Sequence, residues 1–223
     1  ALTALSVIYP LQLIIIALAV GTGVGVNTYM ARLYAQKMPG QAEETAGTGT
    51  LLALGTWFIF AIFSIFCMRP YVLTSANTPE AIESAVIYGQ IVCIGSIGAF
   101  LEGNWTKVHQ SRGNMHRPMV AQTVGALTNI VLDPILIFGL CGAPAFGVKG
   151  AAAATVIGQI TALALAVYFN LRMNKEISFD LRGFRPSLSM IRKIYAIGAP
   201  AIVMQSLNSL MAFGVNLILI GLS

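Results

Sequence analysis

Apolar stretches of about 20 residues recur along this chain, the length a helix needs to cross the hydrocarbon core of a bilayer. This feature limits the possible folds more than any other. Charged residues make up only 9% of the 223 residues, and they lie in clusters between the apolar stretches. A soluble domain carries about 25% charged residues, so the chain lacks the charge that a water-facing surface requires. We therefore expect a protein that lies in a membrane.

Six segments are long and apolar enough to span a bilayer. They cover residues 7–33, 48–67, 81–105, 118–138, 150–171 and 194–222. Membrane barrel strands would alternate apolar and polar residues, whereas stretches such as 13–20 are continuously apolar. Helices satisfy their own backbone hydrogen bonds in lipid. The predicted fold is therefore all-α, a polytopic membrane bundle of six transmembrane helices.

The basic residues predict the orientation of these helices. Of the 13 Lys and Arg residues, 11 fall in the first, third and fifth connections, and only Arg69 and Lys149 fall in the other two. By the positive-inside rule, the odd-numbered connections are cytoplasmic. The net charge of +5 does not indicate a nucleic-acid partner, because these residues flank apolar runs as membrane-facing charges do.

Asp133 is the clearest candidate for chemistry, because an ionisable group at membrane depth is costly and indicates function. Asn129 lies four residues earlier, on the same helix face. A carboxylate and an amide oxygen one turn apart can bind a proton or Na⁺. Pro134 cannot donate a backbone hydrogen bond, which frees an upstream carbonyl as a further ligand. The alternative is a buried Asp that only hydrogen-bonds a neighbouring helix.

Glu102 has two open interpretations. It lies near the predicted cytoplasmic end of its helix, where it either reaches interfacial water beside the anchor Trp105 or attracts cations into a cavity. With Asn104, Gln122 and Gln205, it is a candidate for lining a substrate cavity.

The sequence offers no positive support for an enzyme. It contains no Ser-His-Asp set, zinc motif or nucleotide-binding loop, and the three cysteines lack metal-ligand spacing. We expect no catalytic residues and no cofactor besides a coupling ion. The chain starts at Ala1 rather than Met and ends after an apolar run, so we expect an internal piece of a longer protein.

Three motifs resemble the multidrug and toxic compound extrusion (MATE) family. The first is Asn-Ile-Val-Leu-Asp-Pro at 129–134, followed by Ile-Leu-Ile-Phe-Gly at 135–139. The second is Gly-Val-Lys-Gly-Ala-Ala-Ala-Ala-Thr at 147–155, at the family's usual distance. The third is Ile-Gly-Ala-Pro at 197–200, which opens a helix after a basic linker. The resemblance extends over essentially the whole chain.

The resemblance implies part of a twelve-helix transporter with two lobes. Residues 1–171 would be five helices of the N-terminal lobe, 172–193 the cytoplasmic interlobe linker, and 194–223 the first helix of the C-terminal lobe. Asn129, Asp133 and Thr155 would form a proton or Na⁺ site, although Thr155 can also simply bond its own helix backbone.

The implied activity is export of amphipathic, often cationic, small molecules across the plasma (inner) membrane by antiport with H⁺ or Na⁺. The other expected partners are the lipid bilayer and the rest of the same chain. Two rivals stay open. A lipid-linked oligosaccharide flippase would line its cavity with basic residues, which are almost absent from the apolar segments. A non-transporting scaffold would tolerate Asp133→Asn.

Overall fold

Every element is a helix in the computed structural model, which describes residues 2–73, 79–142, 144–173 and 187–222. The long elements are α1 (Leu2–Ala35), α2 (Pro39–Phe66), α4 (Pro79–Gly95), α5 (Ile97–Gln110), α6 (His116–Phe138), α7 (Val148–Met173) and α8 (Leu188–Leu222). The short ones are α3 (Met68–Leu73) and the 3₁₀ turn η1 (Leu140–Gly142). The all-α prediction is confirmed.

Five predicted membrane spans have direct counterparts. Helices long and apolar enough to cross a membrane cover Val7–Ala35, Pro39–Phe66, Pro79–Gln110, His116–Phe138 and Val148–Arg172 within the described residues. The sixth predicted segment, 194–222, lies in α8, whose side chains beyond Met211 fall outside the described part. That span stays a prediction.

The third span is interrupted at Ser96, where α4 ends and α5 begins. The Ser96 hydroxyl donates to the Cys93 carbonyl at 2.7 Å, and the Trp57 indole N–H donates to the Ile94 carbonyl at 2.8 Å. Side chains therefore take over acceptors at the interruption, which lets this span continue inside the bundle without a continuous helix. The sequence predicted one continuous segment here.

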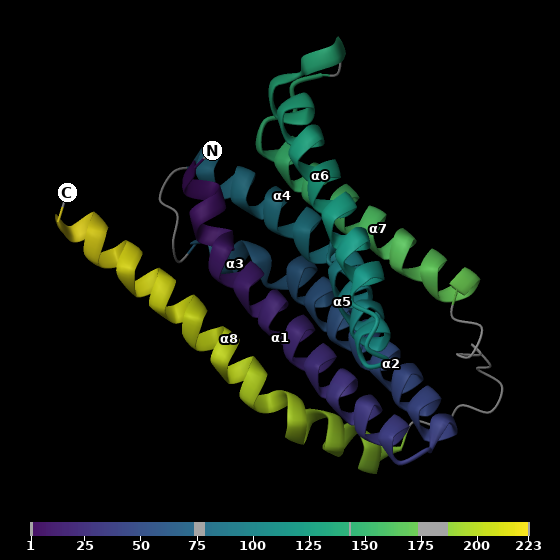
Figure 1. Cartoon of the computed structure of the whole chain (residues 1–223). Coiled ribbons are helices and arrows are strands. Elements are labelled where there is room, and N and C mark those ends of the chain that lie inside the picture. Colours follow the sequence, from purple (N-terminus) through teal and green to yellow (C-terminus); the bar gives the residue numbers. More distant parts are fainter. Residues whose placement is uncertain (1, 74–78, 143, 174–186, 223) are drawn as a thin grey trace.

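The core lies between α1, α2, α4 and α5. One cluster of buried side chains surrounds Ile8, Met68 and Phe100, and a second surrounds Val26 and Trp105. The α6–α7 hairpin stands on one side of this core, where α7 packs on α4 and α5 (Figure 1). The hairpin is therefore free to present one face of α6 away from the core.

Helix α8 lies along α1 on the opposite side of the core (Figure 1). A Cβ atom on Gly198 would collide with the Gly21 carbonyl, and one on Gly25 would collide with the Ile194 carbonyl. Glycines therefore let the two backbones touch. The first helix of a second lobe would be expected to pack poorly on the five helices before it, and this part of α8 does not. Its contacts are nevertheless almost confined to α1, and it does not close a six-helix bundle within the described residues.

The predicted linker, 172–193, begins and ends in helix, and its role between two lobes stays a prediction. Helix α7 continues to Met173 and α8 begins at Leu188, so the 197–200 motif lies inside α8 rather than at its start; residues 174–186 lie outside the described part. The reason is amphipathic: Met190 and Ile194 are buried while Arg192 and Lys193 are exposed, which is a helical period. Arg192 and Lys193, which lie in the predicted linker, are therefore on the exposed face of a helix.

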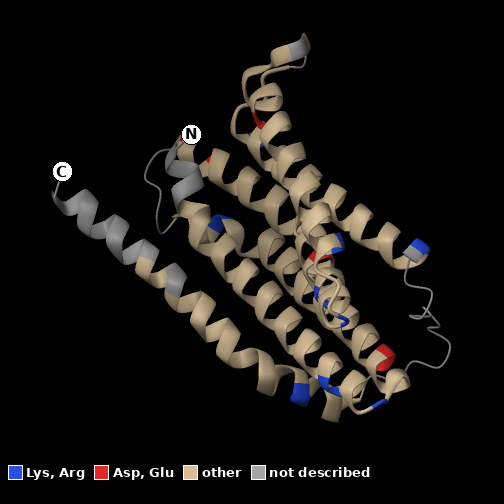
Figure 2. Cartoon of the chain, viewed as in Figure 1, with Lys and Arg blue, Asp and Glu red and all other residues tan. Residues whose placement is uncertain are grey.

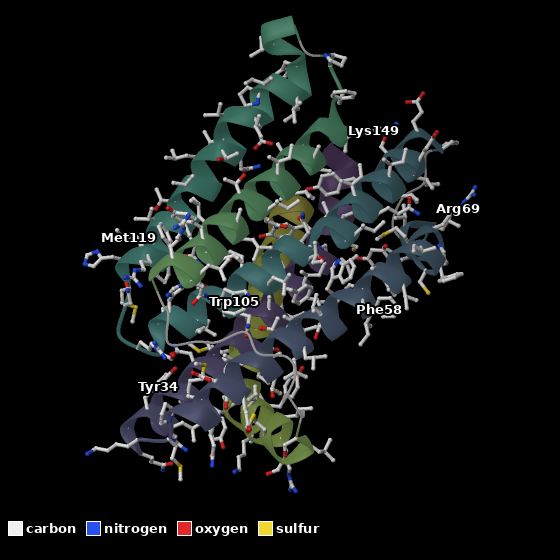
Figure 3. All side chains as sticks on the ribbon, turned by 90° about the vertical axis from the view of Figure 1, so that its right-hand side faces the viewer. Tyr34, Phe58, Arg69, Trp105, Met119 and Lys149 are labelled. Atoms are coloured by element: carbon white, nitrogen blue, oxygen red, sulfur yellow. The ribbon has the colours of Figure 1, made fainter. Side chains whose placement is uncertain are left out.

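The basic residues separate along the bundle. Figure 2 shows Lys and Arg gathered where α1 ends and α8 begins, and again around the α5–α6 connection. Figure 3 places Tyr34, near the end of α1, at the opposite end of the bundle from Arg69 and Lys149. The two basic residues that fall in even-numbered connections thus lie away from the main basic end.

Candidate ion and substrate site between α5, α6 and α7

Two glycines bring α6 and α7 into backbone contact. A Cβ atom on Gly158 would lie 2.8 Å from the Gly125 carbonyl oxygen and 3.0 Å from the Asn129 Cβ atom. A Cβ atom on Gly125 would lie 2.8 Å from the Gly158 carbonyl oxygen. Small residues at a helix crossing permit this approach, and it holds Asn129 directly against α7.

Beside this contact, three helices line an open pocket of about 220 Å³. Its polar lining comes from Glu102 on α5, Gln122 and Asn129 on α6, and Thr155 and Gln159 on α7. Four of these five residues are candidates from the sequence, namely Glu102, Gln122, Asn129 and Thr155. Among the described residues, the structure thus gathers most of the predicted polar side chains into one place.

Gln159 is the lining residue that the sequence analysis did not identify. It lies four residues after Thr155 and so on the same face of α7. That spacing was the available signal. An amide in an apolar helix, one turn from a candidate ligand, belongs to the same site unless it faces lipid.

Two polar atoms at the pocket have no partner among the described residues. Gln122 hydrogen-bonds the Glu102 carboxylate, but Glu102 Oε1 is buried and without a hydrogen bond, as is Asn129 Nδ2. Buried polar atoms are normally satisfied. The pocket therefore holds one unsatisfied acceptor and one unsatisfied donor.

Thr155 keeps its hydroxyl proton inside its own helix. Its Oγ1 donates to the Ala151 carbonyl at 3.0 Å, as the sequence analysis allowed. The oxygen retains lone pairs on the pocket side, so Thr155 can still act as an acceptor for a cation.

Asp133 lies one turn beyond Asn129 and does not line this pocket. It is half-buried. Helix α6 runs through Pro134 to Phe138 without a break. The missing N–H of Pro134 leaves the Ile130 carbonyl without its usual helical donor.

Glu102 lines the pocket, as its cavity interpretation expects. Its suggested interface anchor, Trp105, is only 4% exposed and belongs to the core cluster with Val26 and Val108. Burial within the bundle leaves little of this indole ring to contact lipid, so the cavity interpretation is the one used below.

Asn104 and Gln205 do not line the pocket. Asn104 is 2% exposed and donates to Thr50 Oγ1 at 3.0 Å, which joins α5 to α2. Two residues apart on a helix, Asn104 and Glu102 face different directions. Gln205 lies on α8, which packs on α1 rather than on the hairpin. Both predictions of a cavity position therefore lack support from this geometry.

Comparison with known proteins gives a consistent result. The MatE family profile matches residues 1–135. A protein of Shewanella oneidensis named FAD transporter is 30% identical over 94% of this chain and 46% of its own length. The probable multidrug resistance protein YoeA of Bacillus subtilis is 30% identical, with the same two coverages. The chain thus spans about half the length of the curated relatives it matches.

Solved structures agree. The inward-facing conformation of a multidrug resistance MATE family transporter of the MOP superfamily matches with a TM-score of 0.86 and 28% identity, over 94% of this chain and 47% of that one. The outward-facing conformation of such a transporter also gives 0.86, with 29% identity, over 95% and 46%. The family profile, the relatives and the fold all lead to one conclusion: this chain belongs to the MatE family, the multidrug and toxic compound extrusion proteins.

Proposed function

We propose that the complete protein is a secondary active efflux transporter that exports amphipathic, often cationic, compounds by antiport with H⁺ or Na⁺. The observation that carries this proposal is the pocket of Glu102, Asn129 and Thr155, formed inside an otherwise apolar bundle, with Asp133 one turn away. Polar groups at membrane depth are costly, and gathering several of them in one place is expected of an ion and substrate pathway rather than of packing.

In this proposal Asp133 and Asn129 bind the coupling ion, with Thr155 as a further oxygen ligand. Asp133 supplies the charge that changes state, and Asn129 is the neutral ligand on the same face of α6. Ion binding from outside favours release of the exported compound, and rocking of two lobes then changes which side of the membrane the site faces.

The lobe assignment from the sequence is part of the proposal. The five helices before the linker form a unit of the N-terminal lobe, and α8 is the first helix of the next lobe. Equal similarity to an inward-facing and an outward-facing structure supports a segment that changes little between the two states. The contacts of α8 are almost confined to α1, which supports α8 as a peripheral element of this part of the protein.

The flippase and scaffold alternatives are less well supported. No Lys or Arg lines the described pocket, whereas a pyrophosphate needs basic partners. The same argument bears on the relative named FAD transporter, because a dinucleotide diphosphate would meet the carboxylate of Glu102. A cation is therefore the better match to this pocket.

We propose a multi-pass topology in the plasma (inner) membrane with the odd-numbered connections in the cytoplasm. The native Cys67 is exposed and lies next to Arg69 in the second connection. A membrane-impermeant thiol reagent should therefore label Cys67 in intact cells, while a cysteine at Asn114 should react only after lysis. The reverse pattern would show that the orientation is inverted.

The test of function uses the complete protein in proteoliposomes loaded with a fluorescent organic cation such as ethidium. A pH gradient and a Na⁺ gradient are imposed separately. We expect one of them to drive ethidium export against its own gradient. Export at the same rate with and without either gradient would contradict the antiport proposal.

A further inference from the structure

We propose that Glu102 and Asn129 together select the transported compound, with Glu102 accepting from a protonated amine and Asn129 donating to an acceptor atom on the same ligand. The site assigned is the head-group pocket, defined as Glu102, Gln122, Asn129, Thr155 and Gln159. This assignment rests on the proposed transport function only for the statement that the bound ligand is the transported compound. Binding itself requires no ion gradient.

The first argument is charge. Within the described residues Glu102 has no ion-pair partner. Lys107, which acts on it electrostatically from the same helix, donates instead to Gln110 Oε1 at 2.8 Å. A buried carboxylate oxygen without a paired cation is costly. A ligand that brings a positive charge removes that cost on binding.

The second argument is the hydrogen-bonding character of the two unsatisfied atoms. Glu102 Oε1 can only accept when ionised, and Asn129 Nδ2 can only donate. A ligand that satisfies both carries an N–H donor with positive charge and, a few atoms away, an oxygen acceptor. Alkyl groups alone satisfy neither atom, and an anion satisfies only Asn129.

The third argument is size. The pocket holds about 220 Å³, and small residues form its remaining wall: Gly125, Ala126, Gly158 and Ala162. This space suits the polar end of a ligand rather than an entire drug-sized molecule, whose pockets usually measure about 300–1,000 Å³. The pocket therefore recognises a head group, and the remainder of the ligand extends beyond it.

The test is equilibrium binding to the detergent-purified complete protein, without any gradient. The probes are dansyl ethylenediamine, which has a primary ammonium near two sulfonyl oxygens, and its N-acetylated form, which is neutral. Glu102→Gln should weaken binding of the amine at least about tenfold, the effect of one charge-assisted hydrogen bond. It should leave binding of the acetylated probe unchanged.

The matched control is Glu44→Gln, which removes the same charge from an exposed position on α2. It should change neither affinity. An equal loss for both probes in Glu102→Gln, no loss for the amine, or no detectable amine binding by the wild-type protein would each overturn the proposal.

A second measurement needs no variant and so does not depend on folding of a mutant. Dicyclohexylcarbodiimide modifies carboxyl groups in apolar surroundings, and mass spectrometry of the peptide that contains Glu102 measures the rate. Saturating amine probe should slow this modification, whereas the acetylated probe should not. Equal rates with and without the amine would overturn the proposal. Neither assay measures transport. Both results can therefore be interpreted even if the antiport proposal fails its own test.

Discussion

Two helix pairs in this molecule use the same packing device for different ends. The α6–α7 pair and the α1–α8 pair both meet through glycines, at Gly125 and Gly158 in one and at Gly21 and Gly198 in the other. At the α1–α8 contact, the side chain against Gly21 is the apolar Ile202. At the α6–α7 contact, Asn129 lies against Gly158 and a polar pocket opens beside it.

The comparison teaches that close packing alone does not identify a site. Glycine contacts serve helix association in general, and only the α6–α7 contact has a polar pocket beside it among the described residues. Changes at the α6–α7 contact should therefore affect ligand and ion binding, whereas changes at the α1–α8 contact should affect stability alone.

The largest effect is expected for Gly158→Leu. The new side chain would meet the Gly125 carbonyl at 2.8 Å, and a backbone atom cannot move aside as a flexible side chain can. The helices must separate, so both probe binding and efflux should be lost. Gly55→Leu is the control, because Gly55 has open space around it on α2. Normal probe binding by Gly158→Leu would contradict the claim that the α6–α7 contact determines ligand binding.

Gly198→Leu should destabilise the protein without changing the site. The added side chain would push α8 off α1, and overpacking of this kind costs about 1–3 kcal/mol. A lower midpoint of thermal unfolding is expected, with unchanged probe affinity in the protein that remains folded. Weakened binding at an unchanged unfolding midpoint would show that the two contacts are not separate.

Asn129→Ala removes a neutral ligand and leaves the charge of Asp133. Gradient-driven efflux should fall by roughly 3- to 10-fold, as expected for loss of one neutral hydrogen bond. Initial rates in proteoliposomes measure this, with variant amounts matched by immunoblot. A complete loss would mean that Asn129 contributes more than one ligand contact.

The smallest effect is expected for Tyr34→Phe, near the end of α1 and outside both contacts. The Arg112 Nε–H donates to the Tyr34 hydroxyl at 2.9 Å, and the guanidinium lies 4.8 Å from the ring centre. The ring contact remains in the variant, so stability should fall by only about 0.5–1.5 kcal/mol. Thermal unfolding measures it, and any change in probe affinity would contradict the assignment.

Much of the fold was predictable because lipid leaves few choices. Continuous apolar runs must be helical, so five spans were located to within several residues at most ends. The start of α8 was not located, because the charged Arg192 and Lys193 suggested a linker although they lie on the exposed face of a helix. The interruption at Ser96 was missed because it depends on Trp57, which is distant in the sequence.

Most members of the candidate site were predictable, but their arrangement was not. Asn129 and Glu102 stand out as polar residues in apolar helices, and spacing alone relates Asn129 to Asp133. Which faces meet depends on tertiary packing. That packing placed Asn104 against Thr50 instead of the pocket and brought Gln159 into it.

The central claim is that the polar residues of α6 couple an ion to efflux, and Asp133→Asn tests it most directly. The substitution keeps the shape and removes the charge. In proteoliposomes of the complete protein with an imposed ion gradient, ethidium export should fall to the level of protein-free vesicles, while ethidium binding persists. Export at the wild-type rate with normal ion dependence would show that Asp133 is structural and that coupling lies elsewhere.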